Sequence, residues 1–176
     1  MLPRRKSNST STVAAALSLK KITKSRRKTN LKKEYPKHPM VGVGAIIVRN
    51  GKILIVKRKS EPGKGRWSAP GGLVELGETV GQTVVREAKE ECSLDVEVDR
   101  LIDVVDSLTK DEEGNIKYHF VILDFFVKLK GGELKAGDDA EEARWVPLEE
   151  VEKYNLTKTF REFLKRNMEI LKKYSS

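Results

Sequence analysis

The sequence predicts an α/β fold in which helices pack against a mixed β-sheet. Two apolar runs flank Asn50-Gly51, a dipeptide that favours a tight hairpin turn, so these runs predict two paired strands. One amphipathic segment at about 80–91 and another at 158–173 predict helices, with further strands between them. Strands with helices before and after them are typical of α/β layering.

Local signals place the remaining elements. Leu94, Val96 and Val98 alternate with polar residues and begin a strand, and a polar turn at 111–115 separates that strand from the next. Pro147 ends a short strand and opens a helix. Residues 59–68 are rich in glycine, proline and charge and predict a loop. In chain order we expect strands at Met40–Val48, Ile53–Arg58, Leu94–Val105, Ile116–Leu129 and Arg144–Pro147, and helices at Val80–Glu91, Leu148–Glu152 and Lys158–Lys173.

The central helix has an unusual arrangement of acids. Thr79 and Gln82 have the spacing of a capping box, which predicts a helix start at Val80. At about 100° per residue, Glu87, Glu90 and Glu91 form one group along the edge of the apolar stripe. Partly desolvated carboxylates repel one another unless a cation neutralises them. Oxygen-coordinated divalent cations are the natural partners of such a group.

The alternative is an exposed helix face, in which Arg86 and Glu90 form an i,i+4 ion pair. The flanking residues favour a ligand site instead. Pro70-Gly71-Gly72 predicts a tight turn whose backbone can approach a ligand closely, and Gly77-Glu78 predicts a second turn before the helix.

The segment from Gly72 to Leu94, GLVELGETVGQTVVREAKEECSL, resembles the Nudix box. That pattern is G, five residues, E, seven residues, then R-E-apolar-x-E-E-x-G-apolar, and the chain departs from it only at Ser93, where the family has glycine. Serine in a left-handed position after a helix costs about 1 kcal/mol and touches no proposed ligand. The resemblance covers about 40–174 and implies an α/β/α sandwich around a mixed sheet, with the activity of a metal-dependent pyrophosphohydrolase.

The resemblance also implies roles for individual residues. Arg86 orients the carboxylates by hydrogen bonding. The cation is Mg²⁺ or Mn²⁺, with metal ligands at Glu87, Glu90 and Glu91 and support from Glu78. The general base is a glutamate of the box or an acid of a later loop, and the loop candidates are Asp138, Asp139, Glu141 and Glu142.

Four further residues are candidate substrate contacts. Gly71 and Gly72 allow a close approach of the backbone. Arg58 suits a phosphate or is a solvated strand end. Trp67 stacks on a base or ribose, or packs in the core, which is the favoured interpretation.

Three segments outside the helix, GRWSAPGGLVELGE, YHFVILDFFV and DDAEEARWVPLEEV, resemble the ADP-ribose pyrophosphatase branch of the family. Lys110 stands where many ADP-ribose hydrolases have proline, and the chain lacks the signature associated with NADH hydrolysis. Two other enzymatic roles stay open, hydrolysis of nucleoside triphosphates and of RNA caps. A catalytically silent nucleotide-sensing module is disfavoured by the complete set of acids. Homodimers are common in the branch.

The positive charge of the chain lies at its start. Residues 1–39 hold twelve of the 35 basic side chains and one of the 26 acidic ones, which leaves 23 basic and 25 acidic side chains in 40–176. A domain near neutrality does not predict a nucleic-acid groove, so the small nucleotide remains the expected partner and the tail is the one place for RNA contact.

Residues 1–39 form a basic tail, expected to be disordered, a transit segment or an upstream extension. The apolar patch Val13–Leu19 is too short to span a membrane. The single cysteine, Cys92, excludes an internal disulfide and fits a reducing compartment, so we expect a cytoplasmic protein, or an organellar one if the tail is a transit segment.

Overall fold

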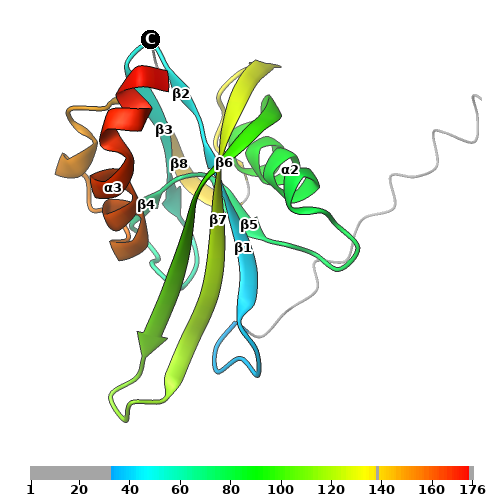
Figure 1. Cartoon of the computed structure of the whole chain (residues 1–176), viewed down its shortest axis with the longest axis vertical. Helices are drawn as coiled ribbons and strands as arrows, with labels where there is room; N and C mark the ends of the chain where they lie inside the picture. The colour runs from blue at the N-terminus through cyan, green and yellow to red at the C-terminus, as the bar shows by residue number, and fades with distance from the viewer. Residues whose placement is uncertain (1–32, 138, 175–176) are drawn as a thin grey trace, which may run out of the picture. The chain divides into compact units, whose positions relative to one another are not determined.

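The computed structural model describes residues 33–137 and 139–174 of the chain (Figure 1). Its strands and helices are β1 (Met40–Ile46), β2 (Val48–Arg49), β3 (Lys52–Arg58), β4 (Trp67–Ser68), β5 (Gly71–Leu73), α2 (Val80–Cys92), β6 (Leu94–Lys110), β7 (Ile116–Gly132), β8 (Ala140–Pro147), the 3₁₀ helix η2 (Val151–Lys153) and α3 (Lys158–Tyr174).

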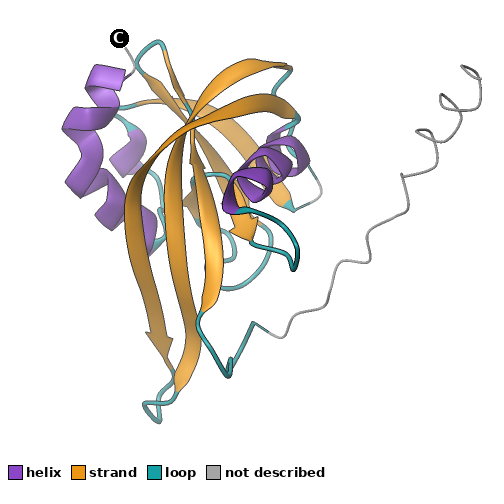
Figure 2. Cartoon of the chain, turned by 45° about the vertical axis from the view of Figure 1, so that its right-hand side comes forward, coloured by secondary structure: helices purple, strands orange, loops and turns teal. Residues whose placement is uncertain are grey.

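The strands form two sheets (Figure 2). The first has the order β5-β1-β7-β6 and is mixed, because β1 runs parallel to β7 whereas the other neighbours are antiparallel. In the second sheet, β3 pairs antiparallel with β2, β4 and β8. The mixed sheet agrees with the expected α/β class, and the division of the strands into a mixed and an antiparallel sheet was not predicted from the sequence.

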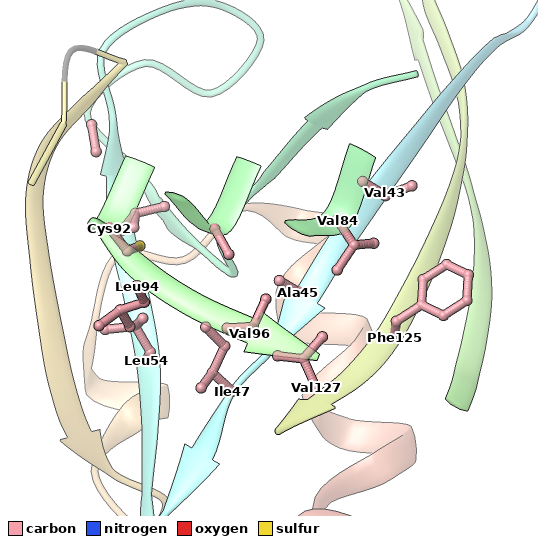
Figure 3. Close-up of a cluster of buried hydrophobic side chains, with 13 residues drawn as sticks. Val43, Ala45, Ile47, Leu54, Val84, Cys92, Leu94, Val96, Phe125 and Val127 are labelled. Atoms are coloured by element: carbon pink, nitrogen blue, oxygen red, sulfur yellow. The ribbon is translucent and has the colours of Figure 1, made fainter. Parts of the chain in front are cut away.

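Helices α2 and α3 lie on opposite sides of the strands (Figure 1), which gives the expected α/β/α layering. Each helix covers its own hydrophobic cluster. Val84 and Ala88 of α2 pack with Leu54 and Val127 (Figure 3), and all four side chains are buried. Phe163 of α3 packs in a second cluster with Phe126 and Ile55, among others. Burial of such side chains stabilises the fold by about 1.5–3 kcal/mol each.

Most predicted elements are confirmed, with small changes at their ends. Asn50 and Gly51 have φ values of 50° and 71°, as a tight hairpin turn requires. The hairpin of β6 and β7 is longer than predicted because the two strands pair as far as the Lys110–Ile116 rung. Three predictions are wrong in detail: the loop 59–68 ends in β4, the glycine turn is strand β5, and the helix predicted on Leu148–Glu152 is a turn followed by η2.

Both ends of α2 agree with the sequence. The capping box is formed, because Gln82 N donates to Thr79 Oγ1 at 3.3 Å and Thr79 N donates to Gln82 Oε1 at 2.9 Å. The helix ends at Ser93, whose φ of 59° is in the left-handed region. The end of the helix therefore has the conformation that glycine supplies at lower cost in the family pattern.

The last residues of the segment expected to be a tail contact the sheet. Tyr118 Oη donates to Glu34 Oε1 at 2.6 Å, and Tyr35 N donates to Lys117 O at 2.9 Å. The rest of that segment, residues 1–32, lies outside the described residues. Within residues 33–137 and 139–174, no helix combines the length and apolar character needed to cross a membrane.

Replacing Ser93 with glycine should stabilise the protein by about 1 kcal/mol, because glycine adopts the left-handed conformation without the steric cost of a Cβ. Urea unfolding at neutral pH measures this change. Ser107→Gly, within strand β6, is the control and should lower stability by about 0.5–1 kcal/mol. A loss of stability in Ser93→Gly would show that the serine hydroxyl or backbone is stabilising there.

Candidate active site

Strand β5 and helix α2 approach each other closely at Gly71 and Gly72. A Cβ at Gly72 would lie 2.2 Å from Glu87 Oε1, and one at Gly71 would lie 2.1 Å from Val43 O. Gly71 N donates to Glu91 Oε2 at 2.9 Å. The two glycines thus allow the close approach expected from the sequence, but they do so within a strand, Gly71 toward the backbone of β1 and Gly72 toward Glu87 of α2.

Arg86 connects the carboxylates at this edge of α2. Its guanidinium donates to Glu78 Oε1 and Oε2 at 2.9–3.2 Å, to Glu87 Oε1 at 2.7 Å and to Glu90 Oε2 at 3.2 Å. It also donates to Leu73 O at 3.1 Å, which ties the helix to β5. The planar, five-donor guanidinium suits such a role, because it can satisfy several acceptors in fixed directions.

The carboxylates differ in burial and in pKa. Glu87 and Glu91 are only 8% and 7% exposed, whereas the side chain of Glu90 is half exposed. Burial raises the pKa of Glu87, against the lowering effect of Arg86. Burial raises the pKa of Glu91 to about 7, although the Gly71 amide acts in the opposite direction. Two neighbouring acids are therefore held where ionisation is unfavourable without a further cation.

Glu78 has the opposite character. Hydrogen bonds from Arg86 lower the pKa of Glu78 to about 2, against a smaller effect of burial, and Thr83 Oγ1 donates to it at 3.1 Å. Glu78 is thus a stable anion whose oxygens bind Arg86 and Thr83. The sequence predicts Glu78 as a supporting metal ligand, whereas in the structure its oxygens bind Arg86 and hold the guanidinium in place.

The acids are close together but do not form a ready-made coordination shell. Among the described residues, no group of three or more His, Cys, Asp or Glu side chains is arranged to hold a metal ion. The hydrogen bonds explain why: Glu87 and Glu90 turn toward Arg86, and Glu91 turns toward the Gly71 amide. Rotation of these side chains is needed before they can share one cation.

The loop between β7 and β8 packs against the end of α2. Gly137 N donates to Glu91 O at 2.9 Å, and Lys135 N donates to Cys92 O at 3.1 Å. A Cβ at Gly137 would lie 1.7 Å from Glu90 O, so only glycine fits there. This contact was not predicted from the sequence. Its one signal there is a glycine that stands directly before the acid-rich segment 138–142.

The structure separates the three loop acids that it describes. Asp139 lies close enough to Glu87 and Glu91 to raise the pKa of both. Glu141 and Glu142 accept hydrogen bonds from Lys57 Nζ at 2.9 and 3.5 Å, on the paired strands β3 and β8. Asp138 lies outside the described residues. Asp139 is therefore the described loop acid placed beside the box.

Of the two remaining candidates, Arg58 acts on the acid cluster through its charge, and Trp67 packs away from it. Arg58 lowers the pKa of Glu91, and its Nε donates to Pro62 O at 2.9 Å. Trp67 is 7% exposed and packs in the cluster under α3, edge-on to Tyr154 at 5.4 Å between ring centroids. This agrees with the packing interpretation of Trp67 and leaves its ring without an open face for stacking.

Cys92 is fully buried in the cluster under α2. Burial raises the pKa of its thiol to about 12, and Glu91 adds to the effect. A thiol with this pKa is not a nucleophile at neutral pH, so the structural interpretation of Cys92 fits its surroundings.

Comparison with known proteins now identifies the family. The sequence model of the NUDIX domain matches residues 38–166. The chain belongs to the Nudix family. An ADP-ribose pyrophosphatase of Methanocaldococcus jannaschii is 46% identical over 135 residues, which cover 76% of each chain. This relationship and the family match make the protein a Nudix pyrophosphohydrolase.

Solved structures agree with this assignment. A MutT Nudix hydrolase of Burkholderia pseudomallei is 32% identical, with a TM-score of 0.60, and the match covers 73% of this chain and 98% of that one. The NUDIX domain of Shewanella oneidensis NrtR, solved as a complex with ADP ribose, is 20% identical, with a TM-score of 0.63 and coverage of 77% and 90%. The latter similarity establishes the shared Nudix fold.

Arg86→Lys should lower kcat about 10- to 100-fold, because lysine keeps the charge but cannot bind three carboxylates in fixed directions. Steady-state kinetics measures the loss, and circular dichroism checks that the fold is kept. Arg161→Lys is the matched control, since Arg161 binds the backbone carbonyls of Glu152 and Tyr154. Equal activity of Arg86→Lys and the wild type would contradict the orienting role.

Proposed function

We propose that this Nudix hydrolase cleaves the pyrophosphate bond of ADP-ribose, with Mg²⁺ or Mn²⁺ as cofactor, and releases AMP and ribose 5-phosphate. The observation that supports this most strongly is the pair of buried carboxylates, Glu87 and Glu91, against the glycine backbone of β5. The identity of 46% to an ADP-ribose pyrophosphatase supports the choice of substrate.

Glu87, Glu90 and Glu91 would hold the cation. Their chemistry fits, because hard divalent ions prefer oxygen ligands and Mg²⁺ usually takes a few carboxylates together with substrate phosphates and water. The raised pKa values of Glu87 and Glu91 show that burial has left their charge only partly compensated. Glu78 would remain with Arg86 and keep the guanidinium in place while the other acids rotate.

When bound, such a cation neutralises phosphate charge and lowers the pKa of a coordinated water. The protein supplies the remaining functions. Arg86 positions the acids, and the closely packed β5 backbone limits where a pyrophosphate can lie. A carboxylate must accept the proton of the attacking water. We infer that this base is either a box glutamate or Asp139, the described loop acid nearest to them.

Arg58 would contribute a phosphate contact. Its Nε is bound to Pro62 O, and no described residue accepts a hydrogen bond from its two terminal nitrogens. Its effect on the pKa of Glu91 shows that its charge reaches the acid cluster. A guanidinium held at one nitrogen and open at the other two suits bidentate binding of a phosphate.

Hydrolysis of nucleoside triphosphates or RNA caps is the second candidate for the same site. Residues 40–176 carry 23 basic and 25 acidic side chains, so a polyanion gains little from the overall charge of this domain. A small ligand held by one cation-bridged pyrophosphate and a few contacts fits better. We infer that the domain 40–176 acts on a small nucleotide and does not need the tail for hydrolysis. We place this activity in the cytoplasm, with the protein as a monomer or a homodimer.

Glu90→Gln and Glu91→Gln should each lower kcat by orders of magnitude while the fold is kept, because each removes one charge from a cation ligand. Assays at increasing Mg²⁺ concentration, with circular dichroism on the same samples, measure the effect. Glu97→Gln is the control, because Glu97 lies exposed on β6 beside Lys130. Wild-type rates in both site variants would rule out the proposed ligand set.

A substrate profile with Mg²⁺ tests the choice of ADP-ribose. We expect kcat/KM for ADP-ribose to exceed that for NADH, any dNTP or capped RNA, with AMP as a product. Arg58→Ala should raise KM more than it lowers kcat if the guanidinium holds a phosphate equally in the ground and transition states. A preference of about tenfold or more for dNTPs or capped RNA would overturn the ADP-ribose proposal and leave the family assignment intact.

A further inference from the structure

Asp124 lies in one rung of the mixed sheet that leads to the acid cluster. The register places Asp103 of β6, Asp124 of β7, Gly44 of β1 and Gly71 of β5 side by side. Gly71 is the residue whose amide binds Glu91. Neighbouring strands are about 4.8 Å apart, so Asp124 and Gly71 are separated by roughly 10 Å along the sheet. Gly72 faces Glu87 of α2, whereas Gly44 and Asp124 face the opposite side of the sheet. A nucleoside joined to a pyrophosphate at Glu91 can span this distance by crossing the edge strand β5.

The Asp124 carboxylate is buried without a hydrogen-bond donor. It is 7% exposed, and no described residue donates a hydrogen bond to it. The nearby donors all bind the adjacent Asp103 instead: Arg166 Nε and Nη2 at 3.2 and 2.8 Å, Asn167 Nδ2 at 2.8 Å, and Val104 N at 2.9 Å. Among the described residues, Ser68 Oγ is the one fully enclosed polar side-chain atom without a partner, so the Asp124 oxygens keep some exposure through which a donor from outside the protein can reach them.

The charges around Asp124 increase this cost. Burial raises the pKa of Asp124 to about 7, and the Asp103 carboxylate adds to the rise, while Arg166 acts weakly in the opposite direction. The ionised acid therefore destabilises the folded protein at neutral pH. If Asp124 had a purely structural role, a neighbouring hydrogen-bond donor or an apolar side chain at this position would make the folded protein more stable.

The Asp124 carboxylate lies against the backbone of β1 at Gly44. A Cβ at Gly44 would lie 2.0 Å from Asp124 Oδ1, so the acid occupies the space beside β1 that a side chain at 44 would fill. Gly42 lies on the same face of β1, because alternate residues of a strand share a face. The side chains nearest to a Cβ at Gly42 are those of Ile122 and Leu73, at 3.8 and 3.9 Å, so glycine backbone with apolar side chains beside it lies between Asp124 and β5.

We propose that Asp124 is a specificity-determining residue that accepts a hydrogen bond from an amino or hydroxyl group on the nucleoside part of the substrate. This inference rests on the proposed function, because the pyrophosphate bound at α2 sets the distance to Asp124. The ligand supplies the hydrogen-bond donor that no described residue provides, and Gly42 and Gly44 let the nucleoside lie close to the backbone of β1.

Asp124→Ala and Asp124→Asn test the inference on the full chain with ADP-ribose. In Asp124→Ala we expect kcat/KM to fall roughly 10- to 100-fold, mainly through KM, since a hydrogen bond to a charged acceptor is lost. Asp124→Asn should lose less, because its amide oxygen still accepts. Asp106→Asn, an exposed acid on β6, is the matched control and should match the wild type.

Thermal unfolding supplies a readout that separates binding from structure. The folded pKa of Asp124 is raised, so its ionisation costs stability above the unfolded pKa, and the full cost is present above about pH 7. Asp124→Asn should therefore have a higher Tm than the wild type at pH 8, and the difference should disappear toward pH 4. A lower Tm together with unchanged KM would show a structural role and overturn the proposal.

Substrate analogues identify the group that Asp124 binds. If it binds the base amino group, the wild type should prefer ADP-ribose to its inosine analogue, and Asp124→Ala should lose that preference. If it binds a ribose hydroxyl, the same pattern should appear with analogues that are deoxygenated in the adenosine half. No change in preference with either series would contradict the inference. If the wild type does not hydrolyse ADP-ribose, the proposed function is wrong but the role of Asp124 is still open to test. The variants are then compared on the substrate that the wild type cleaves with the highest kcat/KM.

Discussion

The guanidinium group of Arg86 lies within hydrogen-bond distance of Glu78, Glu87 and Glu90, and the placement of the site depends on it. Several carboxylates cannot share one edge of a partly buried helix without compensating charge. Arg86 supplies one positive charge and also binds Leu73 O, so the helix and strand β5 are held together by the same group that neutralises the acids. The compensation is incomplete, because Glu91 has no direct contact with Arg86 among the described residues, and its pKa remains raised to about 7.

The negative charge of the acid cluster is only partly neutralised by Arg86. This explains why the site lowers the stability of the fold and why it can bind a cation. A fully neutralised cluster would have no affinity left for Mg²⁺, whereas an uncompensated one would oppose folding. Asp124, two strands away from Gly71 in the same rung, shows the same relation, since no described residue donates a hydrogen bond to its largely buried carboxylate. Functional residues often lower stability in this way, and the two hydrophobic clusters under α2 and α3 provide the stabilisation that offsets it.

Features that depend on neighbouring residues in the chain were predictable from the sequence. The start of α2 at Val80 follows from the Thr79–Gln82 capping box, and the hairpin follows from Asn50-Gly51. Features that depend on the pairing of strands far apart in the sequence were not predictable. Gly71 and Gly72 look like a turn in the sequence but form a strand because β1 pairs with them, and Asp124 reads only as an acid within an apolar run until the register places it in line with Gly71. The order of helices and strands and the acids of the box were therefore predictable, whereas the second sheet and the surroundings of Asp124 required the structure.

The central claim is that the acids of α2 hold the cation that binds the pyrophosphate. Crystals of the protein with Mn²⁺ and an ADP-ribose analogue whose bridging oxygen is replaced by methylene test it directly, because anomalous scattering locates the metal. The account predicts metal peaks at about 2.0–2.3 Å from carboxylate oxygens of Glu87, Glu90 or Glu91, with the analogue's phosphates completing the coordination. Metal bound elsewhere, or an analogue bound at the site without any metal peak, would contradict it.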